Sequence, residues 1–187
     1  MILQILKEET KSLHKETEAL FFGNEIFSGQ LTLGQYQQMI LKNLYVYKQL
    51  EDSIVNSFPK YFSEDDYFPC FGKHKLLEED VKELELKQMV YEIQAPVFSS
   101  PASILGAVYV IEGSMLGGKV IGRKLREIAP LEKVKRFHFY NTERDNGERW
   151  KSFCGFITRN INTHLSIREA TKGATSAFKF FHDVYEK

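Results

Sequence analysis

The residue of this 187-residue chain best suited to metal chemistry is His14. A neutral imidazole is the commonest metal ligand in proteins, and a ligating histidine usually donates its other ring N–H to a carboxylate or a carbonyl. Glu18 follows His14 by four residues, one helical turn, so its carboxylate can accept that hydrogen bond. Thr10 precedes His14 by the same spacing. The alternative is a partly buried surface histidine that binds nothing.

The remaining histidines and the cysteines show no metal-ligand pattern. The other histidines are His74, His138, His164 and His182. They form no HxxxH pair and no ExxH step, and a di-iron carboxylate bundle needs two ExxH motifs. Cys70 and Cys154 are isolated, without CxxC spacing. Two lone cysteines fit a reducing compartment, so we expect a cytoplasmic protein.

A second unusual feature is a series of glycines inside one apolar helical segment, residues 101–128. They are Gly106, Gly113, Gly117, Gly118 and Gly122. Each interior glycine costs a helix roughly 1 kcal/mol relative to alanine, so some contact must require a bare backbone. Either another helix crosses closely there, or a flat ligand lies against the helix, and the spacing leaves both possibilities open. Ser114 adds a hydroxyl that could hold a water beside this bare surface.

The composition excludes some partners. Lys and Arg together number 25, as do Asp and Glu, and we see no polybasic segment, so nucleic acid is not expected. The longest uncharged apolar run, residues 104–111, is much shorter than the roughly 20 residues that span a bilayer. The first residues contain no signal-peptide core. We therefore expect neither a nucleic-acid partner nor a membrane partner.

Helical periodicity throughout the chain predicts an all-α fold with a single domain over residues 1–187. The expected helices cover about 2–22, 32–57, 75–93, 101–128, 146–165 and 166–185. Residues 58–72 and 137–142 are expected to be loops. Thr32 with Gln35, and Ser166 with Glu169, are typical of capping boxes that begin the second and the last helix.

An early histidine helix and a late glycine-rich helix in an all-α domain suggest a haem held between them. His14 would bind the iron from one side, and the glycine-rich helix would cover the other side and leave room for a small gas. Lys7 and Lys11 lie two turns and one turn before His14, where they could reach the haem propionates. The alternative is that both are solvated surface lysines.

These segments resemble motifs of one family. Residues 6–18, LKEETKSLHKETE, resemble the proximal-helix motif of haem oxygenases, in which a Thr precedes the His by four and a Glu follows it by four. Residues 109–118, YVIEGSMLGG, resemble the distal-helix motif, especially that of the bacterial branch. Further landmarks extend the resemblance over nearly the whole chain. They are residues 29–32 with Tyr36, 44–47, 50–51, 76–81 and 147–153.

The resemblance implies an all-helical haem oxygenase fold and the oxidation of haem to biliverdin, iron(II) and carbon monoxide. O2 and electrons from a ferredoxin, flavodoxin or reductase would be consumed. Haem b would be both substrate and cofactor, with His14 as its proximal iron ligand, tuned by Glu18. The implied catalytic residues are His14, Gly113, Ser114 and Gly117. The implied haem-binding residues are Lys7, Thr10, Lys11, His14, Glu18, Tyr109, Gly113, Gly117, Gly118 and Lys151.

Two positions depart from the mammalian-type pattern. Ser114 stands where those members have an Asp that orders a water network, and a serine can position water but carries no charge. Of the Lys and Arg that anchor propionates on a late helix there, only Lys151 has a counterpart, because the Arg position falls near Gly155. A haem-binding or sensing protein without turnover is therefore the alternative function. A third possibility is a helical domain that binds no haem and whose glycines serve only helix packing.

Two further features are weaker. Basic residues late in the glycine-rich helix could receive an acidic ferredoxin, or could be a solvated helix face. They are Lys119, Arg123, Lys124 and Arg126. A related helical family that processes thiamin fragments uses a catalytic cysteine. Cys70 and Cys154 lie outside the motifs above, which makes that family a poorer match.

Overall fold

The computed structural model describes residues 1–58, 62, 72–141 and 146–187. Over these residues the chain forms α-helices and no strand, which confirms the all-α prediction. The helices are α1 (Ile2–Glu9), α2 (Lys11–Leu20), α3 (Gly23–Ser28), α4 (Leu33–Val55), α5 (Lys73–Glu83), α6 (Pro101–Arg126), α7 (Asn146–Asn160) and α8 (His164–Tyr185). A short 3-10 turn, Ala129–Leu131, follows α6. Cys70 lies outside the described residues.

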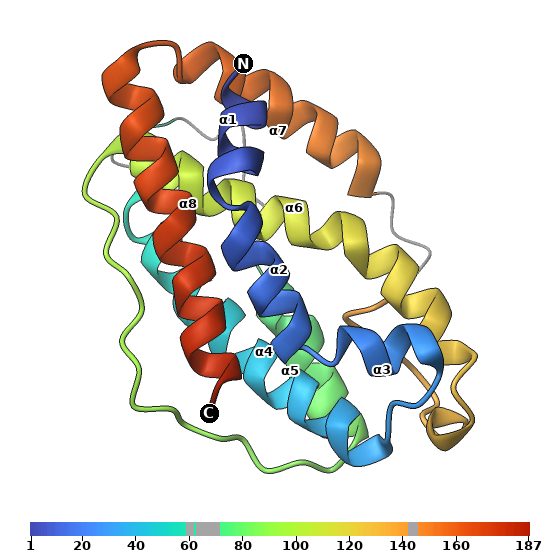
Figure 1. The fold of residues 1–187 in the computed structure, drawn as a ribbon. Helices are drawn as coiled ribbons and strands as arrows, with labels where there is room; N and C mark the ends of the chain where they lie inside the picture. Colours follow the sequence, from blue (N-terminus) through green and yellow to red (C-terminus); the bar gives the residue numbers. More distant parts are fainter. Residues whose placement is uncertain (59–61, 63–71, 142–145) are drawn as a thin grey trace.

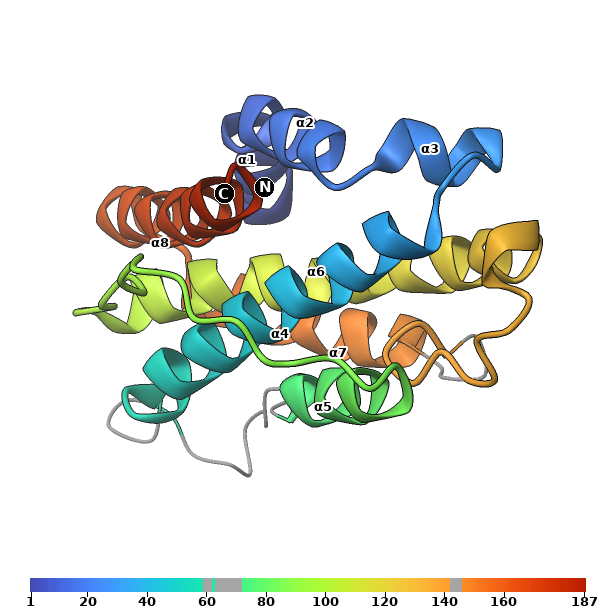
Figure 2. The ribbon, with the colours of Figure 1, turned by 90° about the horizontal axis from the view of Figure 1, so that it is seen from below.

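The glycine-rich helix α6 lies at the centre of the molecule, where it packs against α8, α7, α4 and α3. Figure 2 shows three tiers, with α1, α2, α3 and α8 in the first, α4 and α6 in the second, and α5 and α7 in the third. In Figure 1, the stretch from α1 to α2 passes in front of α6, and α2 lies beside α8. The histidine helix and the glycine-rich helix are therefore in adjacent tiers.

Two glycines allow α6 and α8 to approach closely. A Cβ at Gly106 would lie 1.9 Å from the carbonyl oxygen of Ala170, and a Cβ at Gly173 would lie 2.0 Å from that of Ser103. Real Cβ atoms essentially never come within 3.0 Å of such atoms. Gly106 is therefore a helix-packing glycine, so for this position the packing interpretation holds.

The prediction of one continuous helix over residues 2–22 is wrong, because the structure contains two helices, α1 and α2, there. Thr10, with φ −99° and ψ −1°, separates α1 from α2, and its hydroxyl donates to the carbonyl of Leu6 at 2.7 Å. Such back-bonding by threonine competes with the regular helical pattern and bends helices. Phe22, at φ 56°, then ends the segment, and Gly23 begins α3.

The predicted helix 75–93 begins slightly earlier than expected and ends ten residues sooner, at Glu83. Glu85 adopts φ 53°, and the N–H of Leu86 donates to the carbonyl of Val81 at 2.9 Å, as in a Schellman ending. Glycine usually marks that ending, and Glu85 gave no such signal. Residues 84–99 instead run along α4, where Tyr45 donates to the carbonyl of Ile93 at 2.9 Å.

The predicted boundary between the last two helices is also wrong. The helix α7 ends at Asn160, not 165, and α8 begins at His164 because Thr163, not Ser166, is its N-cap. The Thr163 hydroxyl accepts from the N–H of Ser166, and the Ser166 side chain accepts from the N–H of Thr163. The predicted capping box at Thr32 and Gln35 is confirmed. Residues 137–141 contain no helix or strand, as expected.

The N-cap of α6 is Ser100, whose hydroxyl accepts from the N–H of Ser103, and Pro101 is the first residue of the helix. Over the described residues, α6 alone is long and apolar enough to count as a possible membrane span, and 56% of that apolar window is buried inside the protein. A helix in the core of a protein can have the same length and apolar composition, so these two properties are weak evidence for a membrane span.

Candidate functional site

Two clefts open between α2 and α6 and meet at a shared wall. The first, of about 160 Å³, is called the tyrosine cleft because Tyr47, Tyr140 and Tyr185 line it. The second, of about 280 Å³, is called the lysine cleft because Lys7 and Lys11 line it. The residues that line both clefts are His14, Val110, Gly113, Ser114 and Phe178.

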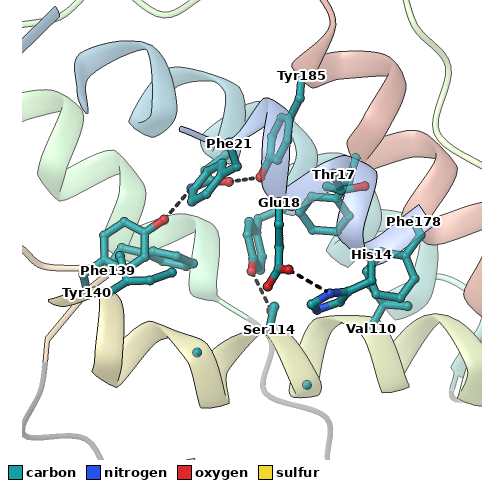
Figure 3. A pocket seen from close by; sticks show the side chains of 16 residues that line it. His14, Thr17, Glu18, Phe21, Val110, Ser114, Phe139, Tyr140, Phe178 and Tyr185 are labelled. Carbon is teal, nitrogen blue, oxygen red and sulfur yellow. Dashed lines mark hydrogen bonds and ion pairs between the residues drawn. The ribbon is translucent and has the colours of Figure 1, made fainter. Parts of the chain in front are cut away.

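His14 lies on α2 at the junction of the two clefts. Its side chain is 53% exposed, and its Nδ1 atom lies 3.4 Å from Oε2 of Glu18. The ring edge meets Phe178 of α8 at 5.4 Å between centroids, which limits its rotation. Figure 3 shows His14 and Glu18 facing Ser114 of α6 across the cleft. With Nδ1 directed to Glu18, Nε2 is the atom available to a ligand.

The glycines of α6 differ in what surrounds them. Gly117 is exposed in the tyrosine cleft, and a Cβ there would have no heavy atom of a described residue within 4 Å, apart from its own helix backbone and chain neighbours. A Cβ at Gly113 would only touch the Trp150 ring, at 3.6 Å. Neither position is occupied by a crossing helix, unlike Gly106. The bare backbone therefore faces open space opposite His14, where a flat ligand can lie.

Ser114 is hydrogen-bonded on the α6 side of the cleft. Its Oγ donates to the carbonyl of Ile111 at 2.7 Å and lies 2.7 Å from the hydroxyl of Tyr47 on α4. Burial raises the pKa of Tyr47 above its ordinary value, and the Ser114 hydrogen bond opposes that shift only in part. The phenol therefore stays protonated at neutral pH, and the pair can orient water or a small ligand.

The inner end of the tyrosine cleft is a second polar network. Tyr185 donates to Oδ1 of Asn43 in a short hydrogen bond, and Nδ2 of Asn43 donates to the hydroxyl of Tyr140 at 3.0 Å. Burial raises the pKa of both tyrosines. Thr17 also lines this cleft, and its buried Oγ1 has no hydrogen-bond partner among the described residues. The rest of the wall is mainly apolar, with aromatic side chains from Phe21, Phe139, Phe178 and Phe181.

The segment that carries Phe139 and Tyr140 is held by a buried carboxylate of α5. Oδ1 and Oδ2 of Asp80 accept from the backbone N–H groups of His138 and Phe139 at 2.7 and 2.9 Å. Burial raises the pKa of Asp80 to about 6, since desolvation outweighs the two backbone hydrogen bonds. This anchor fixes part of the cleft wall although Asp80 does not line the cleft.

The lysine cleft brings together several residues named from the sequence. Lys7, Thr10, Lys11 and Tyr109 line it, and Trp150 of α7 completes its wall. Both lysines are exposed, whereas the Thr10 side chain is buried. Burial raises the pKa of Tyr109, and a hydrogen bond with Thr10 opposes that shift. The two ammonium groups therefore stand where an anionic ligand group could reach them.

Some predicted residues lie elsewhere, and several lining residues were not predicted. Gly118 is buried and lines neither cleft, although a Cβ there would also have no close neighbour. Lys151 is exposed on α7 and lines neither cleft, whereas its neighbour Trp150 does. Lining residues that were not predicted from the sequence as site residues include Asn43, Tyr47, Tyr140, Phe178 and Tyr185, although Tyr47 lies in the landmark segment 44–47.

Comparison with known proteins gives a consistent family. A family model described as Heme oxygenase matches residues 1–187. The "Heme oxygenase" of Xanthomonas campestris pv. campestris (strain 8004) is 33% identical over 106 residues, which cover 57% of this chain and 62% of that protein. "Heme oxygenase PigA" of Pseudomonas aeruginosa is 32% identical over 88 residues, 47% of this chain and 44% of that protein. The matched regions thus span less than two thirds of either relative.

Solved structures with low sequence identity share the fold. The NO- and CO-bound heme oxygenase from Neisseria meningitidis has a TM-score of 0.74 at 20% identity, covering 100% of this chain and 90% of that one. The heme oxygenase from Leptospira interrogans has a TM-score of 0.78 at 18% identity, covering 98% of both chains. The heme oxygenase-1 from Synechocystis sp. PCC6803, in complex with heme, has a TM-score of 0.74 at 16% identity, covering 99% and 90%.

Proposed function

Because this chain belongs to the haem oxygenase family, whose general function is haem degradation to biliverdin, we propose that it binds haem between α2 and α6 and cleaves it oxidatively. The products are biliverdin, iron(II) and carbon monoxide, and O2 and external electrons are consumed. The observation that carries the proposal is the half-exposed imidazole of His14 opposite the bare backbone of Gly117 in one cleft.

The residues of the two clefts fit haem b in shape and in chemistry. The empty space beside Gly117 accepts a flat surface, and the aromatic side chains of Phe139, Phe178 and Phe181 offer an apolar wall for a macrocycle. Lys7 and Lys11 supply positive charge for two carboxylates at the lysine cleft. The unpartnered hydroxyl of Thr17 leaves one polar atom for a ligand or water.

Each residue then has a role set by its place. Haem, when bound, would supply the iron that activates O2, and Nε2 of His14 would hold that iron. Glu18 accepts from Nδ1 and makes the imidazole a more basic ligand. Across the cleft, Gly113 and Gly117 would leave room for a small ligand, and Ser114 with Tyr47 would orient water there. Among the described residues that line the two clefts, His14 is the only histidine. A strong acid–base group opposite it would favour heterolytic, peroxidase-like chemistry instead.

The electron donor is proposed to be an acidic one-electron protein such as a ferredoxin or flavodoxin. The supporting observation is a set of basic side chains on and after the C-terminal part of α6. Lys119, Arg123, Lys133, Lys135 and Arg136 are exposed, and half-exposed Lys124 is paired with Glu127. Opposite charges accelerate association between such partners. A reducing, cytoplasmic location also belongs to this proposal, because Cys154 is a free thiol.

The first experiment is a visible spectrum of the purified protein with one equivalent of hemin, before and after a ferredoxin system is added in air. A Soret band that forms and then decays into the broad red absorbance of biliverdin, with carbon monoxide released, is the expected result. A Soret band that persists would contradict turnover and favour a haem-binding protein without oxygenase activity. That alternative is motivated by Ser114, which stands where mammalian-type members have an Asp. No Soret band would refute haem binding itself.

Two histidine variants identify the ligand. His14→Ala removes the proposed iron ligand from a half-exposed position, so we expect an unchanged helical circular dichroism spectrum, an altered Soret band and no turnover, with partial recovery on adding imidazole. His164→Ala, at the exposed start of α8, is the matched control and should behave as the native protein. Normal turnover by His14→Ala would show that another residue binds the iron.

A further inference from the structure

A buried ammonium group lies directly behind the distal side of the cleft. Lys73, the first residue of α5, has a side chain that is only 1% exposed. Its Nζ donates to the carbonyl of Ile111 at 2.8 Å and lies 3.7 Å from Oε2 of Glu112. Burial of a charge is costly unless it is paired and hydrogen-bonded. Arg149 also reaches both oxygens of Glu112, at 3.2 Å, so the carboxylate does not depend on Lys73 alone.

The position of Lys73 is fixed by the helix that carries Tyr47. The backbone N–H groups of Gly72 and Lys73 donate to Glu51 at 2.8 and 2.9 Å, and Glu51 follows Tyr47 by one turn of α4. Nδ1 of His74 lies 2.5 Å from the same carboxylate. Glu51 is itself buried. The ammonium group and the Tyr47 phenol are thus held by one rigid contact between α4 and α5.

The Ile111 carbonyl is shared between two side-chain donors. It accepts from Nζ of Lys73 and from Oγ of Ser114, in addition to the backbone N–H that an interior helical carbonyl accepts. Ser114 has a single hydroxyl proton, and its oxygen also lies 2.7 Å from the Tyr47 hydroxyl. The proton can therefore point to Ile111 or to Tyr47, but not to both.

These two orientations have different consequences for the cleft. When Ser114 donates to Ile111, Tyr47 donates to Ser114, and no phenolic proton faces the cleft. When Ser114 donates to Tyr47, the Tyr47 proton is free to turn into the cleft that Tyr47 lines. The second orientation takes Ser114 away from the Ile111 carbonyl, where Lys73 still donates. In both orientations a side chain therefore donates a hydrogen bond to the Ile111 carbonyl. The change from one orientation to the other requires only rotation of the Ser114 and Tyr47 O–H bonds.

We propose that Lys73 is a positioning residue that holds the Ile111 carbonyl, so that the Ser114 hydroxyl can turn to Tyr47 and Tyr47 can donate its hydrogen bond to a small ligand bound beside Gly117. The inference rests on the proposed haem site. It assigns to a lysine outside both clefts a role in hydrogen bonding on the distal side. Loss of the ammonium group should fix Ser114 on Ile111 and withdraw the Tyr47 donor.

The test measures the affinity of the ferric haem complex for fluoride at one fixed pH. The shift of the Soret band on adding fluoride reports the binding. Fluoride is a small anionic acceptor whose affinity rises when a donor points to it. Lys73→Met should weaken fluoride binding by about threefold to tenfold, the usual effect of losing one hydrogen bond. Lys73→Arg keeps a donor for the carbonyl and should retain most of the affinity. Lys75→Met, at an exposed position of α5, is the matched control.

A double-mutant cycle separates positioning from simple loss of positive charge. In a Tyr47→Phe background the phenolic donor is absent, so Lys73→Met should have almost no further effect on fluoride affinity. An equal effect in both backgrounds would overturn the proposal, because charge loss or general loosening of the fold acts without Tyr47. If Lys73→Met does not fold, Lys73→Gln, which removes the charge and shortens the side chain, takes its place in the same cycle.

The haem titration that precedes fluoride keeps the two proposals apart. No Soret band in the native protein would refute the proposed function, and this inference with it. A normal Soret band together with an unchanged fluoride affinity in Lys73→Met would refute the inference alone. Hemin affinity should be nearly equal in the native protein and in Lys73→Met, because Lys73 lines neither cleft.

Discussion

The substitution Gly117→Ala separates the two explanations of the glycine-rich helix. Gly117 is exposed inside α6, and within the described part of the chain a Cβ there would meet no heavy atom of another element within 4 Å. If a haem lies on this surface, the added methyl group will stabilise the protein without ligand and weaken haem binding. A glycine that served packing, such as Gly106, would instead destabilise the fold when substituted.

The magnitudes follow from the structure. Alanine is more favourable than glycine in a helix interior by about 0.8–1.0 kcal/mol, and no steric term opposes this gain at Gly117. In a chain of this size about 1 kcal/mol raises Tm by about 2–4 °C. A methyl group between the helix and a close-packed ligand typically costs about 1–3 kcal/mol, which lowers affinity about fivefold to a hundredfold.

The assay is thermal unfolding of the ligand-free protein combined with hemin titration, and it compares three alanine variants. Gly34→Ala, at an exposed position of α4 with no neighbour within 4 Å of the added Cβ, should gain some stability and bind hemin normally. Gly106→Ala should lower Tm, because a Cβ 1.9 Å from the Ala170 oxygen forces α6 and α8 apart. Gly117→Ala alone should combine a higher Tm with weaker binding.

Two results would refute this reasoning. If Gly117→Ala binds hemin as tightly as Gly34→Ala does, no ligand lies against this part of α6, and the bare backbone needs another explanation. If Gly117→Ala lowers Tm in the ligand-free protein, the space beside this glycine is filled, and the helix-packing interpretation extends from Gly106 to the whole segment.

Three further predictions concern the surroundings of the cleft. Glu18→Gln weakens the acceptor for His14 Nδ1, so the haem reduction potential should rise, and an unchanged potential in spectroelectrochemistry would contradict that link. The raised pKa of Asp80 means that the folded chain binds its proton more tightly than the unfolded chain, so the unfolding free energy should fall by up to about 3 kcal/mol between pH 4 and 6. In Asp80→Asn, the urea midpoint of unfolding should depend less on pH between pH 4 and 6. A dependence as steep as in the native protein would show that Asp80 does not cause it. Joint reversal by Lys119→Glu and Arg123→Glu should slow turnover with an acidic ferredoxin at low salt but not with ascorbate, and equal slowing with both would exclude a docking role.

The sequence was most informative where a signal is local. Helical periodicity predicted the all-α fold, and the Thr32–Gln35 capping box predicted the start of α4, because both depend on neighbours within a few residues. The spacing from His14 to Glu18 likewise predicted a contact inside one helical turn, which the structure contains. The boundary at Glu83 was missed because Glu85 adopts a backbone conformation that glycine usually marks.

The tertiary structure decided what the glycines face and which distant side chains complete the site. Gly106 and Gly117 look alike in the sequence, yet one meets α8 and the other meets open space. Tyr47 reaches Ser114 across 67 residues of sequence, and Lys73 reaches Ile111 across 38. Such contacts depend on how the helices pack, and helix packing is determined by the whole set of buried surfaces rather than by any short segment. One sequence alone could therefore indicate the histidine helix and the glycine-rich helix, but not that Tyr47 and Lys73 lie behind the glycine-rich helix.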